Sequence, residues 1–231
     1  GSLFCEYGSE PYEREKFSSI KQALGKTSPS IQVKTFAAFQ TVLDLEEIIS
    51  SPAYKKPKST KDMLKLFSSS LGVGDGGLFQ VKDPLPLPSQ LKPLPSLDVF
   101  SQTDSLHSYT PDELTQLLPD SLKAGFLSRE SYFPGGETEA LLRLQRKVSG
   151  EVDFVNNFRK PKTASTNKSG DPMEPSTTGL SPYLSTGCLS VRMLWKECEK
   201  CYLQGNHSEP PESLHGQLLF REMFYLLSRS V

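Results

Sequence analysis

Several features of membrane and secreted proteins are missing from this sequence. No apolar run approaches the roughly 20 residues that a membrane-spanning helix needs. Residues 1–12 lack the charged-then-apolar order of a secretory signal. The four cysteines have no framework spacing, which fits free thiols in a reducing compartment. These absences predict a soluble intracellular protein without membrane partners.

An excess of positive charge is also missing. The chain has 26 Lys and Arg against 27 Asp and Glu, a formal net charge of −1. No global basic field therefore attracts nucleic acid, although a local basic groove stays possible.

Metal and hydrolase motifs are missing as well. Cys198 and Cys201 are followed by His207, but a structural zinc site needs a second ligand pair that the sequence does not supply. No Gly-x-Ser-x-Gly elbow and no phosphate-binding P-loop occurs. We therefore expect no metal ion, and no residue is assigned a catalytic role.

The first part of the chain is typical of an α/β protein. Residues 3–7 and 31–36 are short apolar runs that predict strands, and residues 13–24 repeat apolar side chains at helical spacing. Strand, helix and strand in this order predict parallel pairing. We interpret residues 1–50 as the end of an α/β domain.

Residues 51–134 are predicted to form an interdomain connector. A short helix is expected at residues 43–49, at the end of the preceding domain, and another at 61–70 in the connector, with Thr60 as its N-cap. Five prolines then remove backbone donors and favour an extended linker; they are Pro84, Pro86, Pro88, Pro93 and Pro95. A ligand for a proline-recognising domain is the alternative. Thr110, Pro111 and Glu113 predict a helix start with a capping box.

Residues 135–231 are predicted to be helical. Apolar periodicity favours a helix after Gly136 and further helices at residues 189–203 and 214–227, whereas polar residues 160–175 predict a surface loop. The turn at residues 175–182 gathers hydroxyls, a glycine and backbone donors before an apolar helical segment. Such a turn can bind phosphate oxygens, although Ser/Thr/Gly/Pro turns are common without that role.

Three motifs together resemble the photolyase/cryptochrome family, in its 6-4 photolyase and animal cryptochrome branch. They are GGETEAL (135–141), STTGLSPYL with GCLS (176–190), and GQLLFRE (216–222). Each motif alone is common, but their order and spacing are specific. Residues 4–12 (FCEYGSEPY) are similar to the late part of the family's antenna domain.

The resemblance implies an α/β plus all-α architecture: the end of a Rossmann-like antenna domain, a long linker, and the first part of a helical FAD-binding domain. It also implies that further flavin contacts lie beyond this chain, so that the chain alone is not expected to hold FAD tightly. The segment implied to grip the flavin phosphates consists of Thr177, Thr178, Gly179, Leu180 and Ser181.

Further along, Gln217 and Arg221 match positions that line the flavin pocket, and Gln217 also faces the substrate opening. Phe220, which faces the substrate as well, stands where the family usually has Trp, and Ser185 with Thr186 replace the usual Arg/Lys-Phe. The Trp-to-Phe departure puts DNA repair in doubt, since that Trp helps to receive a flipped-out lesion.

The leading hypothesis is a cryptochrome-type FAD flavoprotein that acts as a blue-light photoreceptor or circadian-clock regulator through clock or signalling proteins. The alternatives are a 6-4 DNA photolyase that repairs damaged DNA, and an incomplete chain without flavin activity; whether the protein is an enzyme stays open. The resemblance also implies residence in the nucleus and cytoplasm, and a second, antenna chromophore such as a folate or a deazaflavin.

Overall fold

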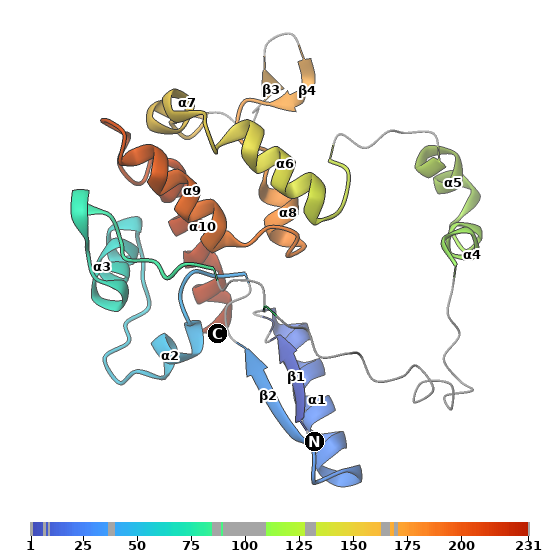
Figure 1. Cartoon of the computed structure of the whole chain (residues 1–231). Helices are drawn as coiled ribbons and strands as arrows, with labels where there is room; N and C mark the ends of the chain where they lie inside the picture. The colour runs from blue at the N-terminus through green and yellow to red at the C-terminus, as the bar shows by residue number, and fades with distance from the viewer. Residues whose placement is uncertain are drawn as a thin grey trace. The chain divides into compact units, whose positions relative to one another are not determined.

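The computed structural model describes most of the chain, in two compact units that are treated separately below (Figure 1). One unit comprises residues 1–84 with 133–231, and the other comprises residues 85–132. The described residues are 2–6, 8, 10–36, 40–84, 89, 110–127, 133–162, 167–168 and 171–230.

The first unit begins with a parallel strand–helix–strand arrangement, as predicted. Strand β1 (Ser2–Glu6) pairs with β2 (Gln32–Phe36) in a register that runs from Ser2 opposite Gln32 to Glu6 opposite Phe36. Helix α1 (Pro11–Thr27) connects the two strands, and none of its side chains is buried. Parallel pairing requires such a crossover connection. A two-stranded sheet does not by itself define a Rossmann-like domain, so that assignment stays a prediction.

Two short helices follow, and side-chain caps set where each begins. The Asp44 carboxylate accepts hydrogen bonds from two backbone N–H groups at the start of α2 (Leu45–Ser50). Helix α3 (Thr60–Leu71) is capped by Ser59, whose hydroxyl accepts from the Asp62 N–H at 3.2 Å. The prediction of Thr60 as the cap was therefore wrong by one residue, because Ser59 and Thr60 carry equivalent hydroxyls in sequence. A 3-10 turn, η1 (Asp75–Gly77), comes next.

The second unit contains helices α4 (Pro111–Gln116) and α5 (Asp120–Leu127). The capping box is confirmed: the Thr110 N–H donates to the Glu113 carboxylate at 2.7 Å, while the Glu113 N–H donates to the Thr110 hydroxyl at 3.3 Å. The predicted extended linker falls almost wholly outside the described residues, including Pro86, Pro88, Pro93 and Pro95.

The later part of the first unit is mainly helical, as predicted. Its helices are α6 (Glu137–Lys147), α7 (Val152–Asn157), α8 (Ser181–Ser185), α9 (Val191–Tyr202) and α10 (Leu214–Arg229). Strands β3 (Asn167–Lys168) and β4 (Asp171–Pro175) pair antiparallel. Part of the surface loop predicted over 160–175 therefore forms paired strands. The two strands pair through their backbones, but their sequence lacks the alternating apolar residues by which strands are usually predicted.

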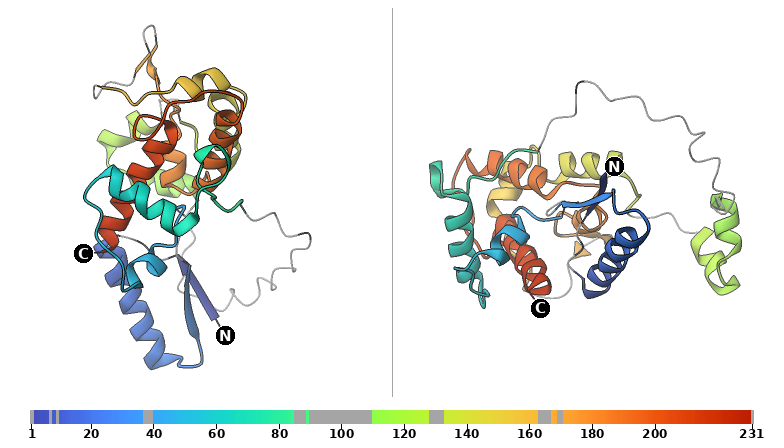
Figure 2. Two further views of the ribbon diagram at one scale, coloured as in Figure 1. Left: turned by 90° about the vertical axis from the view of Figure 1, so that its left-hand side faces the viewer. Right: turned by 90° about the horizontal axis from the view of Figure 1, so that it is seen from below.

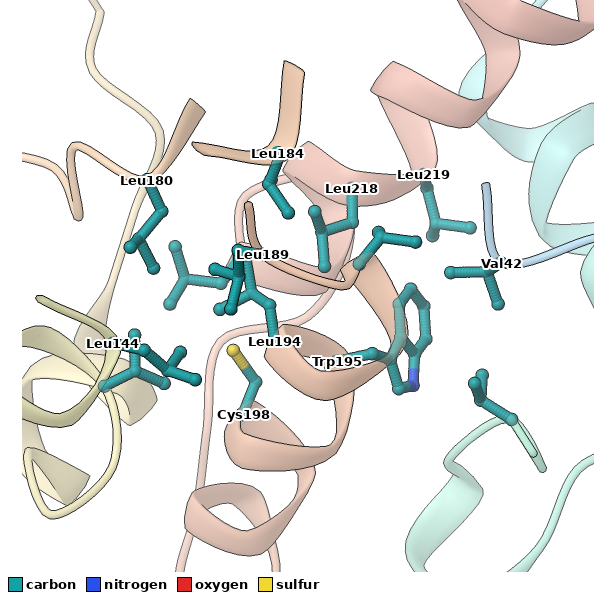
Figure 3. Close-up of a cluster of buried hydrophobic side chains, with 14 of the residues drawn as sticks. Val42, Leu144, Leu180, Leu184, Leu189, Leu194, Trp195, Cys198, Leu218 and Leu219 are labelled. Carbon is teal, nitrogen blue, oxygen red and sulfur yellow. The ribbon is translucent and has the colours of Figure 1, made fainter. Parts of the chain in front are cut away.

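One hydrophobic core joins α3, the residues before α2, and helices α6 to α10. Trp195 on α9 lies at its centre, fully buried and stacked on Phe67 of α3 with ring centroids 5.8 Å apart. Figure 3 shows the leucines of α8, α9 and α10 converging on this region, with Val42 and Leu144 at its edges. Helix α10 packs against both α3 and α9, and the two turned views show it among the other helices of the unit (Figure 2). The core therefore fixes α10, which carries three of the candidate site residues, Gln217, Phe220 and Arg221.

Candidate functional site

The turn at residues 177–181 lies between β4 and the short helix α8. Thr178 and Leu180 are buried, and the Leu180 N–H donates to the Thr178 hydroxyl at 3.4 Å. Gly179 has a φ of +63°, a conformation that favours glycine over residues with a side chain. Ser181 begins α8. The five predicted residues thus form one continuous turn, as their adjacency in sequence requires.

A buried arginine on α6, Arg143, forms a hydrogen bond with this turn; the sequence did not reveal it. Arg143 on α6 is 4% exposed, and its Nε–H donates to the Thr178 carbonyl at 3.0 Å. Its guanidinium also lies over the Phe133 ring, 4.8 Å from the centroid. The available signal was a cation between the core positions Ala140 and Leu144 on the apolar face of a predicted helix.

Residues preceding and opening the turn line a pocket of about 320 Å³. Its polar lining residues are Ser176, Thr177, Asn157 and Arg159, and the Asn157 amide also donates to the Asp153 carbonyl at 2.9 Å. The apolar lining comes from Phe154, Phe158 and Pro161. Hydroxyl, amide and guanidinium donors together suit an anionic ligand such as a phosphate.

Arg221 connects α10 to α8 and to the segment before α2. Its guanidinium donates to the carbonyls of Gln40 and Leu184, the latter at 3.4 Å. It also contacts the Tyr225 hydroxyl at 3.2 Å and lies 4.6 Å from the centre of that ring. The Tyr225 hydroxyl in turn donates to the Gln40 side chain at 2.5 Å. Arg221 is therefore held near the C-terminal end of α8, the helix that follows the turn.

Gln217 and Phe220 lie on the same helix but make different contacts. The half-buried Gln217 side chain donates to the Pro211 carbonyl at 3.4 Å. Phe220 is 47% exposed and packs edge-to-face on Phe224 with centroids 4.9 Å apart. The structure brings Arg221 to α8, whereas Gln217 contacts the loop before α10.

A second residue that the sequence reasoning missed is Glu222, which is fully buried on α10. Its carboxylate accepts the Val42 N–H at 2.8 Å and the Leu43 N–H at 3.3 Å. Arg192 of α9 donates to the Val42 carbonyl at 3.2 Å. Burial raises the pKa of Glu222 to about 7, and these two N–H groups with the charges of Arg221 and Arg192 offset only part of that effect.

The two cysteines of α9 are free thiols. Cys198 and Cys201 are both buried, and burial raises the pKa of each thiol, which makes both unreactive. Within the described part of the chain, no group of three or more His, Cys, Asp or Glu side chains could hold a metal ion. In the same residues, no helix is both long and apolar enough to cross a membrane.

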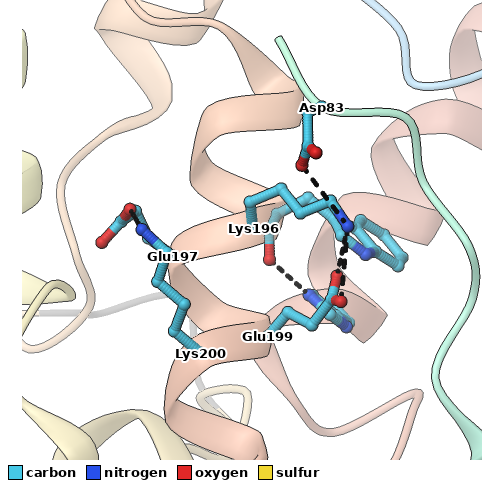
Figure 4. Close-up of polar contacts among 7 residues, drawn as sticks. Asp83, Lys196, Glu197, Glu199 and Lys200 are labelled. Atoms are coloured by element: carbon cyan, nitrogen blue, oxygen red, sulfur yellow. Dashed lines mark hydrogen bonds and ion pairs between the residues drawn. The ribbon is translucent and has the colours of Figure 1, made fainter. Parts of the chain in front are cut away.

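The solvent-facing side of α9 carries ion pairs instead. Lys196 contacts Glu199 at 3.2 Å and Asp83 at 3.7 Å, and Lys200 contacts Glu197 at 2.5 Å (Figure 4). On the buried side, the His215 ring donates a hydrogen bond from Nε2 to the Trp195 carbonyl at 3.0 Å. Burial lowers the pKa of His215 to about 3, so its ring is neutral. These contacts fix α9 against the residues packed around it.

Comparison with solved structures shows the class of fold. The structure matches the crystal structure of a Synechocystis cryptochrome with a TM-score of 0.58 and 21% sequence identity, over 99% of this chain and 41% of that one. The chain therefore has the fold of the corresponding part of a cryptochrome.

Sequence comparison supplies the family. The chain is 32% identical over 227 residues to cryptochrome-1 of Rattus norvegicus and 31% identical over 242 residues to the (6-4)DNA photolyase of Arabidopsis thaliana. Each alignment covers 96% of this chain, and the chain spans about a third of the length of these relatives. No protein-family model matches it. The chain belongs to the photolyase/cryptochrome family, which confirms the resemblance described above.

Proposed function

We propose that this chain is part of an FAD-binding flavoprotein of the cryptochrome type, which acts as a blue-light photoreceptor or circadian-clock regulator. The observation that carries the proposal is the pocket beside the turn, because it combines phosphate-binding donors with the motif that the family resemblance assigns to the flavin phosphates. Similarity to cryptochrome-1 over 96% of the chain supports the same assignment.

The residues fit the cofactor in kind. Ser176, Thr177 and Arg159 line a pocket of about 320 Å³, at the lower end of the size usual for ligand sites. That volume suits a diphosphate with part of a nucleotide. When bound, FAD would supply the group that absorbs blue light and transfers electrons. The residues of this chain would bind its phosphates through the turn and limit the position of its ring through Gln217 and Arg221.

Electrostatics favour an anionic ligand at this place. Arg159, which lines the pocket, carries a permanent positive charge. Hydroxyl and amide groups can donate directional hydrogen bonds, so that a phosphate near the arginine can be bound in one orientation.

The first test is the absorption spectrum of the full-length protein that contains this chain, after gel filtration. Retained flavin bands would support the proposal, and their absence even after reconstitution with FAD would refute it. Thr177→Val removes a pocket hydroxyl at nearly constant volume and is expected to weaken FAD binding about 5- to 10-fold, the cost of one hydrogen bond. Thr186→Val is the matched control, because that hydroxyl bonds carbonyls inside α8.

A 6-4 DNA photolyase is the second candidate, and the similarity to the Arabidopsis enzyme favours it. Against it stands Phe220, which lacks the ring N–H of the Trp usual at this place. Light-driven repair of a 6-4 lesion by the flavin-loaded protein decides between the two. Repair would establish the photolyase, whereas flavin without repair would favour the receptor. We further propose residence in the nucleus and cytoplasm, which imaging of the tagged protein would test.

A further inference from the structure

Arg143 occupies the space that Gly179 leaves open. A β-carbon added at Gly179 would lie 2.8 Å from Nε and 2.9 Å from Cζ of Arg143, closer than real contacts allow. Only a glycine permits both the φ of +63° and this approach of the guanidinium. The turn and the arginine therefore fit each other closely.

The hydrogen bond from Arg143 sets which way the turn faces. Its Nε–H holds the Thr178 carbonyl toward α6, and the Thr178 hydroxyl is engaged by the Leu180 N–H. The neighbouring Thr177 lines the pocket that Arg159 also lines. Since one peptide group of the turn is fixed toward the core, the adjacent residue is fixed toward the pocket.

The Arg143 side chain is itself held in place. It is buried at 4% exposure and its guanidinium lies over the Phe133 ring, so little of its rotamer freedom remains. A group fixed in this way can position its neighbour without moving when a ligand arrives.

We propose that Arg143 is a positioning residue for the phosphate-binding turn: it orients residues 177–181 so that Thr177 presents its donor to the ligand's phosphates. This inference rests on the proposed function, because it takes FAD as the ligand. It adds a residue outside the turn, on a different helix, whose effect on the cofactor is indirect.

The test uses the full-length protein with Arg143→Lys and Arg143→Met, and with the same substitutions at the exposed Arg146 as matched controls. FAD affinity is measured by quenching of flavin fluorescence. Both Arg143 variants lose the Nε–H, so we expect FAD binding to weaken about 10-fold, as for loss of one charge-assisted hydrogen bond. The Arg146 variants are expected to bind FAD as the unmodified protein does.

A second readout separates positioning from a general loss of structure. In the ³¹P NMR spectrum of bound FAD, the two phosphorus resonances are expected to shift in Arg143→Lys, while the visible bands of the flavin ring stay unchanged. If Arg143→Met fails to fold, Arg143→Lys keeps the cation and the long stem and still allows this measurement.

A double-mutant cycle tests the contact itself. Gly179→Ala is expected to weaken FAD binding more than about 10-fold in the unmodified protein but much less in Arg143→Met, where the obstructing guanidinium is gone. Additive losses, or FAD affinity and phosphorus resonances unchanged in Arg143→Lys, would overturn the inference while leaving the proposed function intact. Failure of the unmodified protein to bind FAD would overturn both.

Discussion

Replacing Glu222 with Gln should change how stability depends on pH. The Glu222 side chain is fully buried, and burial raises its pKa to about 7 from the ordinary 4.5. Between these two values the folded chain keeps a proton that the unfolded chain releases. The free energy of unfolding therefore falls as pH rises from about 4.5 to 7, and this group adds no further change above 7.

The size of the effect follows from the two pKa values. A rise from 4.5 to about 7 corresponds to about 3 kcal/mol of unfolding free energy. Glutamine cannot ionise, and its amide has one oxygen where the carboxyl group of Glu222 has two to accept from the Val42 and Leu43 N–H groups. We expect the unmodified chain to be more stable than Glu222→Gln at pH 5, and the difference to shrink by about 3 kcal/mol by pH 8.

Urea unfolding at pH 5, 6, 7 and 8, followed by circular dichroism, measures this difference. Glu197→Gln is the control of opposite sign. Burial raises the pKa of Glu197, but hydrogen bonds from Lys200 and Ser149 outweigh it and leave the pKa below its ordinary value. Any pH dependence from Glu197 therefore falls below pH 4.5, and its variant should run parallel to the unmodified chain from pH 5 to 8. Parallel profiles for Glu222→Gln as well would refute the reasoning.

Two further predictions concern packing. Gly216→Ala should destabilise the chain by about 1–3 kcal/mol in a thermal melt, because the new methyl group would lie 2.8 Å from Cα of Pro211 and still closer to its carbonyl. Gly25→Ala is the control: its methyl group would meet open space within α1, so the variant should be as stable as the unmodified chain or more stable. Cys198 and Cys201 should react with a thiol reagent only on unfolding, since both are buried with raised thiol pKa values; labelling of the native protein at either position, detected by mass spectrometry, would contradict this.

Local signals in the sequence predicted most of the helices. The box at Thr110, Pro111 and Glu113 placed the start of α4 correctly, because each partner lies within one helical turn. Apolar periodicity likewise predicted α9 and α10 to within a few residues. Parallel pairing of β1 with β2 followed from the helix between them. Where two neighbouring residues offered the same cap, as Ser59 and Thr60 did, the choice could not be made from sequence.

The polar groups inside the core could not be predicted in the same way. Glu222 bonds with Val42 across 180 residues, and Arg143 with Thr178 across 35. No spacing rule connects residues so far apart, so a charged residue on an apolar helix face shows only that a partner is needed. The turn at residues 177–181 could be predicted because its members are consecutive in sequence. Arg143 on α6, which bonds with this turn, could not. Its flavin-binding role, with those of Gln217 and Arg221, stays a prediction.

The attachment of α10 to the beginning of the chain has a consequence for folding during synthesis. Glu222 holds Val42, and the Arg229 side chain donates to the Gly8 carbonyl at 2.9 Å and pairs with Glu46. A ribosome that adds 5–20 residues per second needs about 10–35 s to make the 180 residues between Val42 and Glu222. During that interval the hydrogen bonds from the Val42 and Leu43 N–H groups to Glu222 cannot form. Helix α10 is thus needed to complete the hydrogen bonds of a segment made much earlier.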